Sequence, residues 1–198
     1  MKGVFEQGDN YTYGVGDFVQ LRTWLIAHLM WNPHLDQEKL TDEFLQGYYG
    51  AAGPYLKQYM DLMKNSFLAS NRSLSTYNLD YSFLTLDVMN QSTHLFEKAA
   101  NSVRDQKVLL DRVRRAKLSL DLAWLERYQL LRRIAAKNNQ PFLGPDDPQA
   151  AIDQFTAAAK TFGIQNHYSE GGDLKRYIAR LPDTLTKPAP LPDFLKDV

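Results

Sequence analysis

The chain has 198 residues, a length at which a folded domain buries roughly 70% of its unfolded surface, so we expect one or two globular domains with a sizeable core. Its 23 lysine and arginine residues equal its 23 aspartate and glutamate residues, so no net field attracts nucleic acid or an anionic membrane surface, and neither is an expected partner. The absence of cysteine and of any apolar run of signal-peptide or membrane-spanning length excludes disulfides and membrane insertion but does not choose a compartment.

The chain begins with a strand-like segment, Gly3 to Gly8, and a glycine-rich loop over residues 9–16 that carries Tyr11 and Tyr13. No nearby segment offers a second strand, and a single strand cannot satisfy its own backbone hydrogen bonds. We therefore expect this segment either to lie irregularly against the helices or to belong to a sheet outside this chain.

Apolar residues then recur at helical spacing and predict a first helix, for which Asp17 can serve as the N-cap. The spacing is carried by Phe18, Val19, Leu21, Leu25, Ile26, Leu29 and Met30. The pair Asn32-Pro33 ends this helix, because proline disfavours the helical region for the residue before it.

Asp36 is placed to cap a second helix that runs from Gln37 to about Tyr49. Gly50 suits the left-handed position after it, and Gly53-Pro54 opens a third helix with proline in its first turn. That third helix is expected to reach about Ala69, and most of it should be buried.

A polar, turn-rich loop over residues 70–82 precedes a fourth helix, which we expect from Phe83 to Ala100. The stretch from about Arg104 to Asn138 holds neither glycine nor proline, so it predicts one helix roughly 50 Å long. One side of this helix is apolar and would form the spine of a bundle. That side carries Leu109, Val113, Ala116, Leu120, Trp124, Leu131 and Ala135.

Three prolines and a glycine break the pattern over residues 138–148, and Asp147-Pro148 then starts a sixth helix that Gly163 stops. Its inward-facing residues are expected to be Ile152, Phe155, Ala159 and Phe162. Asp173 can cap a short seventh helix through Leu181, and the last residues, with four prolines, predict an extended tail.

These elements predict an all-α bundle or array of about six to seven helices with one long central helix, preceded by a short orphan strand-like segment. We expect three regions: 1–17, a remnant strand and loop; 18–181, the helical domain; and 182–198, a proline-rich extended tail.

Glu6 is the candidate catalytic residue, because it ends a strand before a glycine-rich loop, as catalytic carboxylates do on α/β barrels. A solvated acid is the simpler interpretation and stays open. A glycosidase needs a second carboxyl roughly 5 to 9.5 Å away. The nearby candidates, Asp9 and Asp17, are more naturally loop and cap residues. Tyr11 and Tyr13 could stack on a sugar ring or pin their loop to the core.

Other residue pairs have simple structural explanations. Tyr55 and Tyr59 could form a stacking shelf, but an aromatic stripe at helical spacing is usually core. His94 and Glu97 share a helical face, yet the Glu-x-x-His contributions of a di-metal bundle are absent, so we expect no metal and no cofactor. The basic residues of the long helix alternate with acids, as on a solvated, salt-bridged face. These are Arg112, Arg114, Arg115, Lys117, Arg132 and Arg133, with Asp111, Asp121 and Glu126 among them.

Three stretches in fixed order carry a family resemblance: Gly3-Val4-Phe5-Glu6-Gln7-Gly8-Asp9, then Leu21 to Trp31-Asn32-Pro33, then Leu40 to Tyr49-Gly50. Together they resemble an uncharacterised glycoside-hydrolase-like family, domain of unknown function 4838, over about the first sixty residues. The helix, Trp-Asn-Pro and helix arrangement is also similar to the region after the catalytic barrel in α-glucuronidases. Farther along, only helical character and the long central helix agree.

The resemblance implies that Glu6 stands at the C-terminal end of a late barrel strand as a catalytic residue, with Asp9, Tyr11 and Tyr13 as substrate-binding residues at the rim. It also implies a parent protein that acts on or binds carbohydrate outside the cytoplasm, secreted or periplasmic. A barrel takes about 250 residues, far more than precede the first helix here, so we expect the barrel to lie upstream of this chain.

We therefore expect the C-terminal helical domain of a carbohydrate-active, glycoside-hydrolase-like protein. Its partners would be the upstream barrel domain and, through the parent protein, carbohydrate, and it would not be catalytic alone. The alternative is a free-standing helical module that binds a protein partner or forms a homodimer through the long helix. An exposed apolar stripe over residues 104–138 would favour that alternative.

Overall fold

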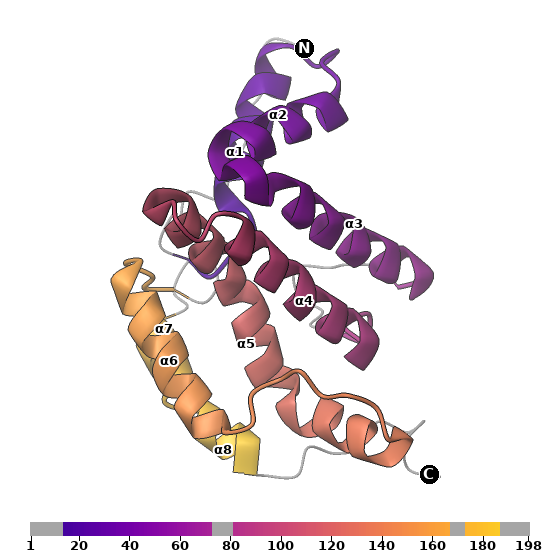
Figure 1. Cartoon of the computed structure of the whole chain (residues 1–198), viewed down its shortest axis with the longest axis vertical. Coiled ribbons are helices and arrows are strands. Elements are labelled where there is room, and N and C mark those ends of the chain that lie inside the picture. The colour runs from indigo at the N-terminus through magenta and orange to yellow at the C-terminus, as the bar shows by residue number, and fades with distance from the viewer. Residues whose placement is uncertain (1–13, 73–80, 167–172, 187–198) are drawn as a thin grey trace.

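The structure is a computed structural model that describes residues 14–72, 81–166 and 173–186 (Figure 1). Its elements in chain order are α1 (Val19–Trp31), α2 (Gln37–Tyr49), the 3-10 turn η1 (Gly50–Ala52), α3 (Gly53–Ala69), α4 (Leu86–Ser102), α5 (Lys107–Asn138), α6 (Pro148–Thr161), α7 (Leu174–Ile178) and α8 (Leu181–Thr186). Within the described ranges, β pairing is limited to two isolated bridges, Gly14 with Asn166 and Asn166 with Asp173. The prediction of an all-α array around one long central helix is confirmed.

Helix α1 starts without a side-chain cap, and the prediction that Asp17 caps it is wrong. Phe18 occupies the N-cap position in a left-handed conformation, with φ 46° and ψ 42°. The carboxylate of Asp17 is engaged elsewhere, since it accepts hydrogen bonds from Ser119 of α5 and Tyr59 of α3. The end of α1 is as predicted, because Asn32 is extended, with φ −140° and ψ 99°, before the proline.

The predicted signals around α2 and α3 are present. The side chain of Asp36 accepts hydrogen bonds from the backbone N–H groups of Glu38 and Lys39 at 2.9 and 3.2 Å. Gly50 has φ 57° and ψ −131°, a conformation open to glycine although its ψ is not that of a left-handed helix. Helix α3 has proline in its first turn. These local signals end α2 and start α3 within a few residues of each other.

Helix α5 is the spine of the molecule and spans 32 residues, or roughly 48 Å. Figure 1 shows it between α4 on one side and α6 with α8 on the other. The apolar side predicted from the sequence packs into a first core cluster together with residues of α1 to α4. The α5 residues buried in that cluster are Val113, Ala116, Leu120, Trp124, Leu131 and Ala135.

A second buried face of α5 was not predicted. It packs against α6, α7 and α8 in a separate core cluster, to which Val15 also contributes. The α5 residues of this cluster are Leu118, Leu122, Leu125 and Tyr128. A helix that is apolar on two sides is a central one, which explains why the remaining helices arrange themselves around α5.

The helix caps predicted in the C-terminal part are present, but the predicted extended tail is partly wrong. Asp147 accepts hydrogen bonds from two backbone N–H groups at the start of α6, and Asp173 accepts one at the start of α7. Residues 181–186, assigned largely to an extended tail, form helix α8 instead. Leu181 and Leu185 are buried in the second cluster, so apolar burial overrides the proline-rich composition there. The rest of the predicted tail lies outside the described residues.

Candidate functional site

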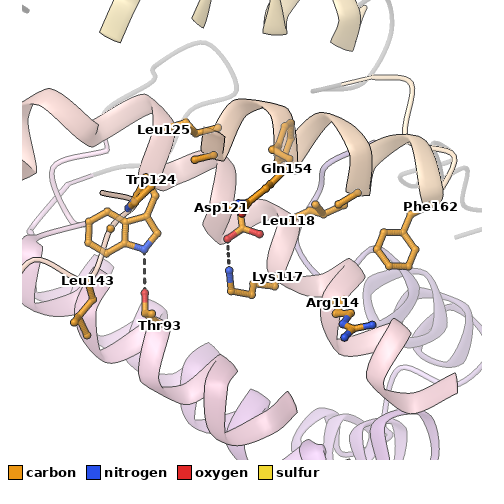
Figure 2. A pocket seen from close by; sticks show the side chains of 15 residues that line it. Thr93, Arg114, Lys117, Leu118, Asp121, Trp124, Leu125, Leu143, Gln154 and Phe162 are labelled. Carbon is orange, nitrogen blue, oxygen red and sulfur yellow. Dashed lines mark hydrogen bonds and ion pairs between the residues drawn. The ribbon is translucent and has the colours of Figure 1, made fainter. Parts of the chain in front are cut away.

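Two pockets open beside α5, each lined by different residues of that helix. The Trp124 pocket lies between α5, α6 and the loop over residues 139–147, and its volume is about 440 Å³. Residues that define it include Arg114, Lys117, Asp121, Trp124, Phe155 and Phe162. In Figure 2, Trp124 and Leu143 lie at one end of this pocket, and Arg114 and Phe162 lie at the other.

The position of Trp124 is fixed from two directions. Its indole N–H donates a 3.0 Å hydrogen bond to the hydroxyl of Thr93 on α4 (Figure 2). The ring of Phe142 meets it edge-on, with 5.2 Å between ring centroids. The loop that carries Phe142 is itself held by Asn90, whose side chain donates to the Pro141 carbonyl and accepts from the Leu143 N–H. The wall of the pocket is thus rigidly anchored to α4.

The polar side of the Trp124 pocket consists of successive turns of α5. Lys117 forms an ion pair with Asp121, and burial raises the pKa of that carboxyl while Lys117 lowers it. Arg114 lies 3.6 Å from Asp111, an acid outside the pocket that has a closer partner in Lys107 at 2.6 Å. The pocket lining therefore carries two cations and one carboxylate.

The second cavity, the Asp17 pocket, has a volume of about 430 Å³ and is defined by Asp17, Tyr59, Phe83, Ser119 and Glu126 among mostly apolar residues. Asp17 Oδ1 accepts a 3.0 Å hydrogen bond from Ser119, and Oδ2 accepts a 3.4 Å hydrogen bond from Tyr59. Burial raises the pKa of Asp17 to about 6, although the two hydrogen bonds and the charge of Arg22 lower it in part. This carboxyl joins the start of α1 to α3 and α5.

Glu126 is the other carboxyl of the Asp17 pocket. Burial raises its pKa, and the hydroxyl of Tyr177 on α7 opposes that shift by donating a hydrogen bond to it. Two carboxyls with raised pKa in one pocket are groups that acid–base catalysis uses. Both accept hydrogen bonds from hydroxyl groups of this same domain, which makes them tethers between helices.

The residues predicted for the sugar site, Glu6, Asp9, Tyr11 and Tyr13, lie outside the described residues. Asp17, which the sequence offered as a second carboxyl for that site, lines the Asp17 pocket.

The two tyrosines of α3 are core residues, as the simpler interpretation of the sequence held. Tyr59 is buried, and its ring centroid lies 4.9 Å from that of Phe96. Tyr55 packs half-buried against the same cluster. They form no open shelf for a sugar ring.

His94 and Glu97 form an exposed pair on α4, with 3.1 Å between Nδ1 and Oε2. In the part of the chain that the structure describes, no group of three or more His, Cys, Asp or Glu side chains could hold a metal ion.

The prediction of a salt-bridged basic face on α5 is confirmed for Arg114, which pairs with Asp111, and for Lys117, which pairs with Asp121. Arg115 donates to the side chain of Gln20, and Arg132 donates to the hydroxyl of Tyr128. Arg112 differs, because its guanidinium lies 4.0 Å from the ring centroid of Tyr48 and donates to the Tyr48 carbonyl at 2.7 Å. It fastens α2 to α5 rather than facing solvent.

Neither pocket was predicted from the sequence. Trp124 was recognised as core, and Arg114 and Lys117 as a charged helix face, but only the docking of α6 makes them lining residues of one cavity. Asp17 had a plausible local role as a cap, and its partners lie 42 and 102 residues away in the chain. No local signal indicates such partners.

The comparisons with known proteins concern the N-terminal third of the chain. Residues 1–61 match a family described as a domain of unknown function, DUF4838. No curated protein and no solved structure matches the chain. No helix among the described residues has the length and apolar character needed to cross a membrane. The match to the DUF4838 model over residues 1–61 agrees with the resemblance predicted from the sequence, whereas the likeness to α-glucuronidases stays a prediction.

Proposed function

We propose that this chain is a helical domain that supports the catalytic barrel of a glycoside-hydrolase-like, carbohydrate-active protein and is not catalytic alone. The match of residues 1–61 to DUF4838 supports the proposal that this chain is a domain from a larger protein family. The glycoside-hydrolase character rests on the resemblance carried by the same residues. The structural observation behind the supporting role is an exposed apolar edge in that matched region.

The apolar edge lies where α1 ends and α2 has not yet begun. Trp31 is 92% exposed, Met30 is 50% exposed and Leu35 is 36% exposed. Large apolar side chains close together on a surface mark sites of contact with another protein surface. Trp is also enriched among the residues that dominate interface energies. The edge is therefore the surface that a neighbouring barrel domain would cover.

The proposal that this chain is not catalytic alone is supported by the way its described carboxyls are engaged. Within the described residues, the two carboxyls of the Asp17 pocket are both hydrogen-bonded to hydroxyls of neighbouring helices. A glycosidase leaves one carboxyl to protonate the leaving oxygen and another to attack or activate water. Groups already serving as tethers are poorly placed for either task.

The dimerisation alternative depended on an exposed apolar stripe along residues 104–138. The apolar residues predicted on that helix pack in or against the first core cluster. Among the described residues of α5, the large hydrophobic that remains exposed is Val108, at 63%. Sedimentation at several concentrations tests this alternative directly.

The decisive experiment compares this chain with the longer gene product that the proposed barrel requires. Genomic DNA upstream of the Met1 codon is read for an in-frame barrel, and both proteins are assayed on a panel of aryl glycosides. We expect hydrolysis only by the longer product. Hydrolysis by the 198-residue chain that is lost in Glu6→Gln or Glu126→Gln would overturn the non-catalytic role.

The docking role is tested by Trp31→Ser in both proteins, with Leu68→Ser as the matched control, because Leu68 is also exposed, at 63%, but lies outside the matched region. Trp31→Ser should lower the melting temperature of the longer product and leave that of this chain unchanged. An equal effect of both substitutions on the longer product would argue against docking at this edge.

A further inference from the structure

We propose that the Trp124 pocket binds a small monocarboxylate with an apolar, aromatic body. This proposal goes beyond the supporting role above and depends on none of its residues. It rests on the shape of the pocket, on its apolar wall and on the balance of charge in its lining.

The apolar wall is built from α5 and from α6 with the residue that follows it. Leu118 and Leu125 come from α5, Phe155 comes from α6, and Phe162 is the C-cap residue of α6. Phe162 is half-buried and lies at the end of the pocket where Arg114 also lies (Figure 2). A volume of about 440 Å³ falls within the range of small-molecule sites. An aromatic ring fits such a wall because flat apolar surfaces stack with little loss of conformational freedom.

Charge in the lining selects a single negative group. Lys117 and Asp121 pair with each other and leave no net charge between them. Arg114 then provides the net positive charge, and its side chain is 61% exposed, so it can turn toward a ligand. Its present contact with Asp111 is 3.6 Å long, and Lys107 already holds that acid at 2.6 Å. Asp111 therefore keeps a partner when Arg114 moves.

A carboxylate matches this arrangement better than other polar groups do. The planar guanidinium presents parallel N–H donors that fit the two oxygens of a carboxylate. A dianion such as a phosphate would carry a second negative charge that the single net positive charge of the lining does not balance. A neutral polar group would leave the net positive charge of the lining unbalanced. The chemistry of the site thus points to one carboxylate attached to an aromatic body.

Trp124 provides a spectroscopic reporter inside the pocket. The chain holds three tryptophans, and the other two are Trp24 and Trp31, so Trp24→Phe with Trp31→Phe leaves Trp124 as the single indole. The full chain carrying these two changes is titrated with 3-phenylpropionate and, separately, with its neutral amide. We expect a saturable change in fluorescence with the acid and at least tenfold weaker binding of the amide.

Arg114→Gln should weaken binding of the acid about tenfold, as expected for loss of a charge-assisted hydrogen bond. Arg104→Gln is the matched control, because Arg104 is also exposed and lies 3.4 Å from an acid, Asp105, away from the pocket. We expect this control to stay within about twofold of the parent. Ala158→Leu, which adds volume at the pocket wall, should abolish binding of the acid.

Thermal melts of each variant establish that it is folded before the titrations are compared. Equal affinity for the acid and the amide, or equal effects of Arg114→Gln and Arg104→Gln, would overturn the proposal. Absence of any saturable signal with 3-phenylpropionate up to the solubility limit of the probe would overturn it as well. None of these results bears on hydrolysis by the longer gene product, so the two proposals fail independently.

Discussion

Asp17 and Ser119 are joined by a 3.0 Å hydrogen bond although 102 residues separate them in the chain. This contact, together with that from Tyr59, holds the start of α1 against the middle of α5. Because the carboxyl is buried, its ionised form is disfavoured in the folded protein. The stability of the domain should therefore depend on pH through this residue.

Folding should stabilise the protonated form of Asp17. Its pKa rises from the ordinary 3.8 to about 6 on folding. The stability that the protonated carboxyl contributes is therefore fully present below about pH 4 and is lost as the pH rises through about 6. This loss lowers the free energy of unfolding by about 3 kcal/mol at most. Asp17→Asn should flatten this part of the profile and raise the free energy of unfolding at pH 8 by about 1 kcal/mol.

Urea unfolding at steps between pH 4 and pH 8 measures this profile. Asp42→Asn is a suitable control, because it removes a carboxylate from the exposed face of α2 and keeps Asp17. Burial raises the pKa of Asp121 and Glu126 too, so some loss of stability with rising pH should remain in Asp17→Asn. Parallel profiles for the parent chain and Asp17→Asn would contradict the assignment.

Gly144 should tolerate no side chain. A Cβ there would lie 2.4 Å from Phe142 Cζ and 2.7 Å from Trp124 Cε3, and both rings are fixed by their neighbours. Gly144→Ala should therefore destabilise the chain by about 1–3 kcal/mol and change the near-ultraviolet circular dichroism of the tryptophans.

The matched control for Gly144→Ala is Gly47→Ala. Gly47 lies in α2 with nothing within 4 Å of its Cβ position, so alanine there should stabilise the chain by about 0.5–1 kcal/mol. The same substitution is thus expected to have opposite signs at the two sites. A neutral effect of Gly144→Ala in thermal and urea unfolding would mean that the loop moves freely away from Trp124.

Much of the fold could be predicted because its signals are local. Asp36 and Asp147 are followed directly by the backbone N–H groups that they cap, so a few residues of sequence suffice to place α2 and α6. The long helix α5 follows from the absence of glycine and proline. Its first buried face follows from helical periodicity, which is a property of the segment alone.

The features that could not be predicted depend on contacts between distant segments of the chain. Leu118 and Leu125 on α5 are as apolar as their neighbours, but only the arrival of α6 to α8 defines a second buried face for them. Asp17 was assigned a local role because its cap position is visible in sequence, whereas Tyr59 and Ser119 become its neighbours only after folding. Both pockets consist of such long-range neighbours, which is why neither could be predicted.

The two faces of α5 should respond separately to cavities. Leu131 is fully buried in the first cluster and Leu125 is 2% exposed in the second. Either residue changed to alanine should cost about 2–5 kcal/mol. Hydrogen exchange should then rise mainly in α1 to α4 for Leu131→Ala and mainly in α6 to α8 for Leu125→Ala. Identical exchange patterns in the two variants would mean that the clusters unfold as one unit.

Helix α8 should be an integral part of the domain. Leu185 is 6% exposed and packs in the second cluster, although it lies among prolines. Leu185→Ser removes apolar burial and places a hydroxyl in an apolar site, so it should cost about 2–3 kcal/mol. Leu68→Ser, at a residue that is 63% exposed, should change the free energy of unfolding by less than about 0.5 kcal/mol. If urea unfolding gives the same small change for both variants, α8 does not pack on α5 in solution, and the domain ends before it.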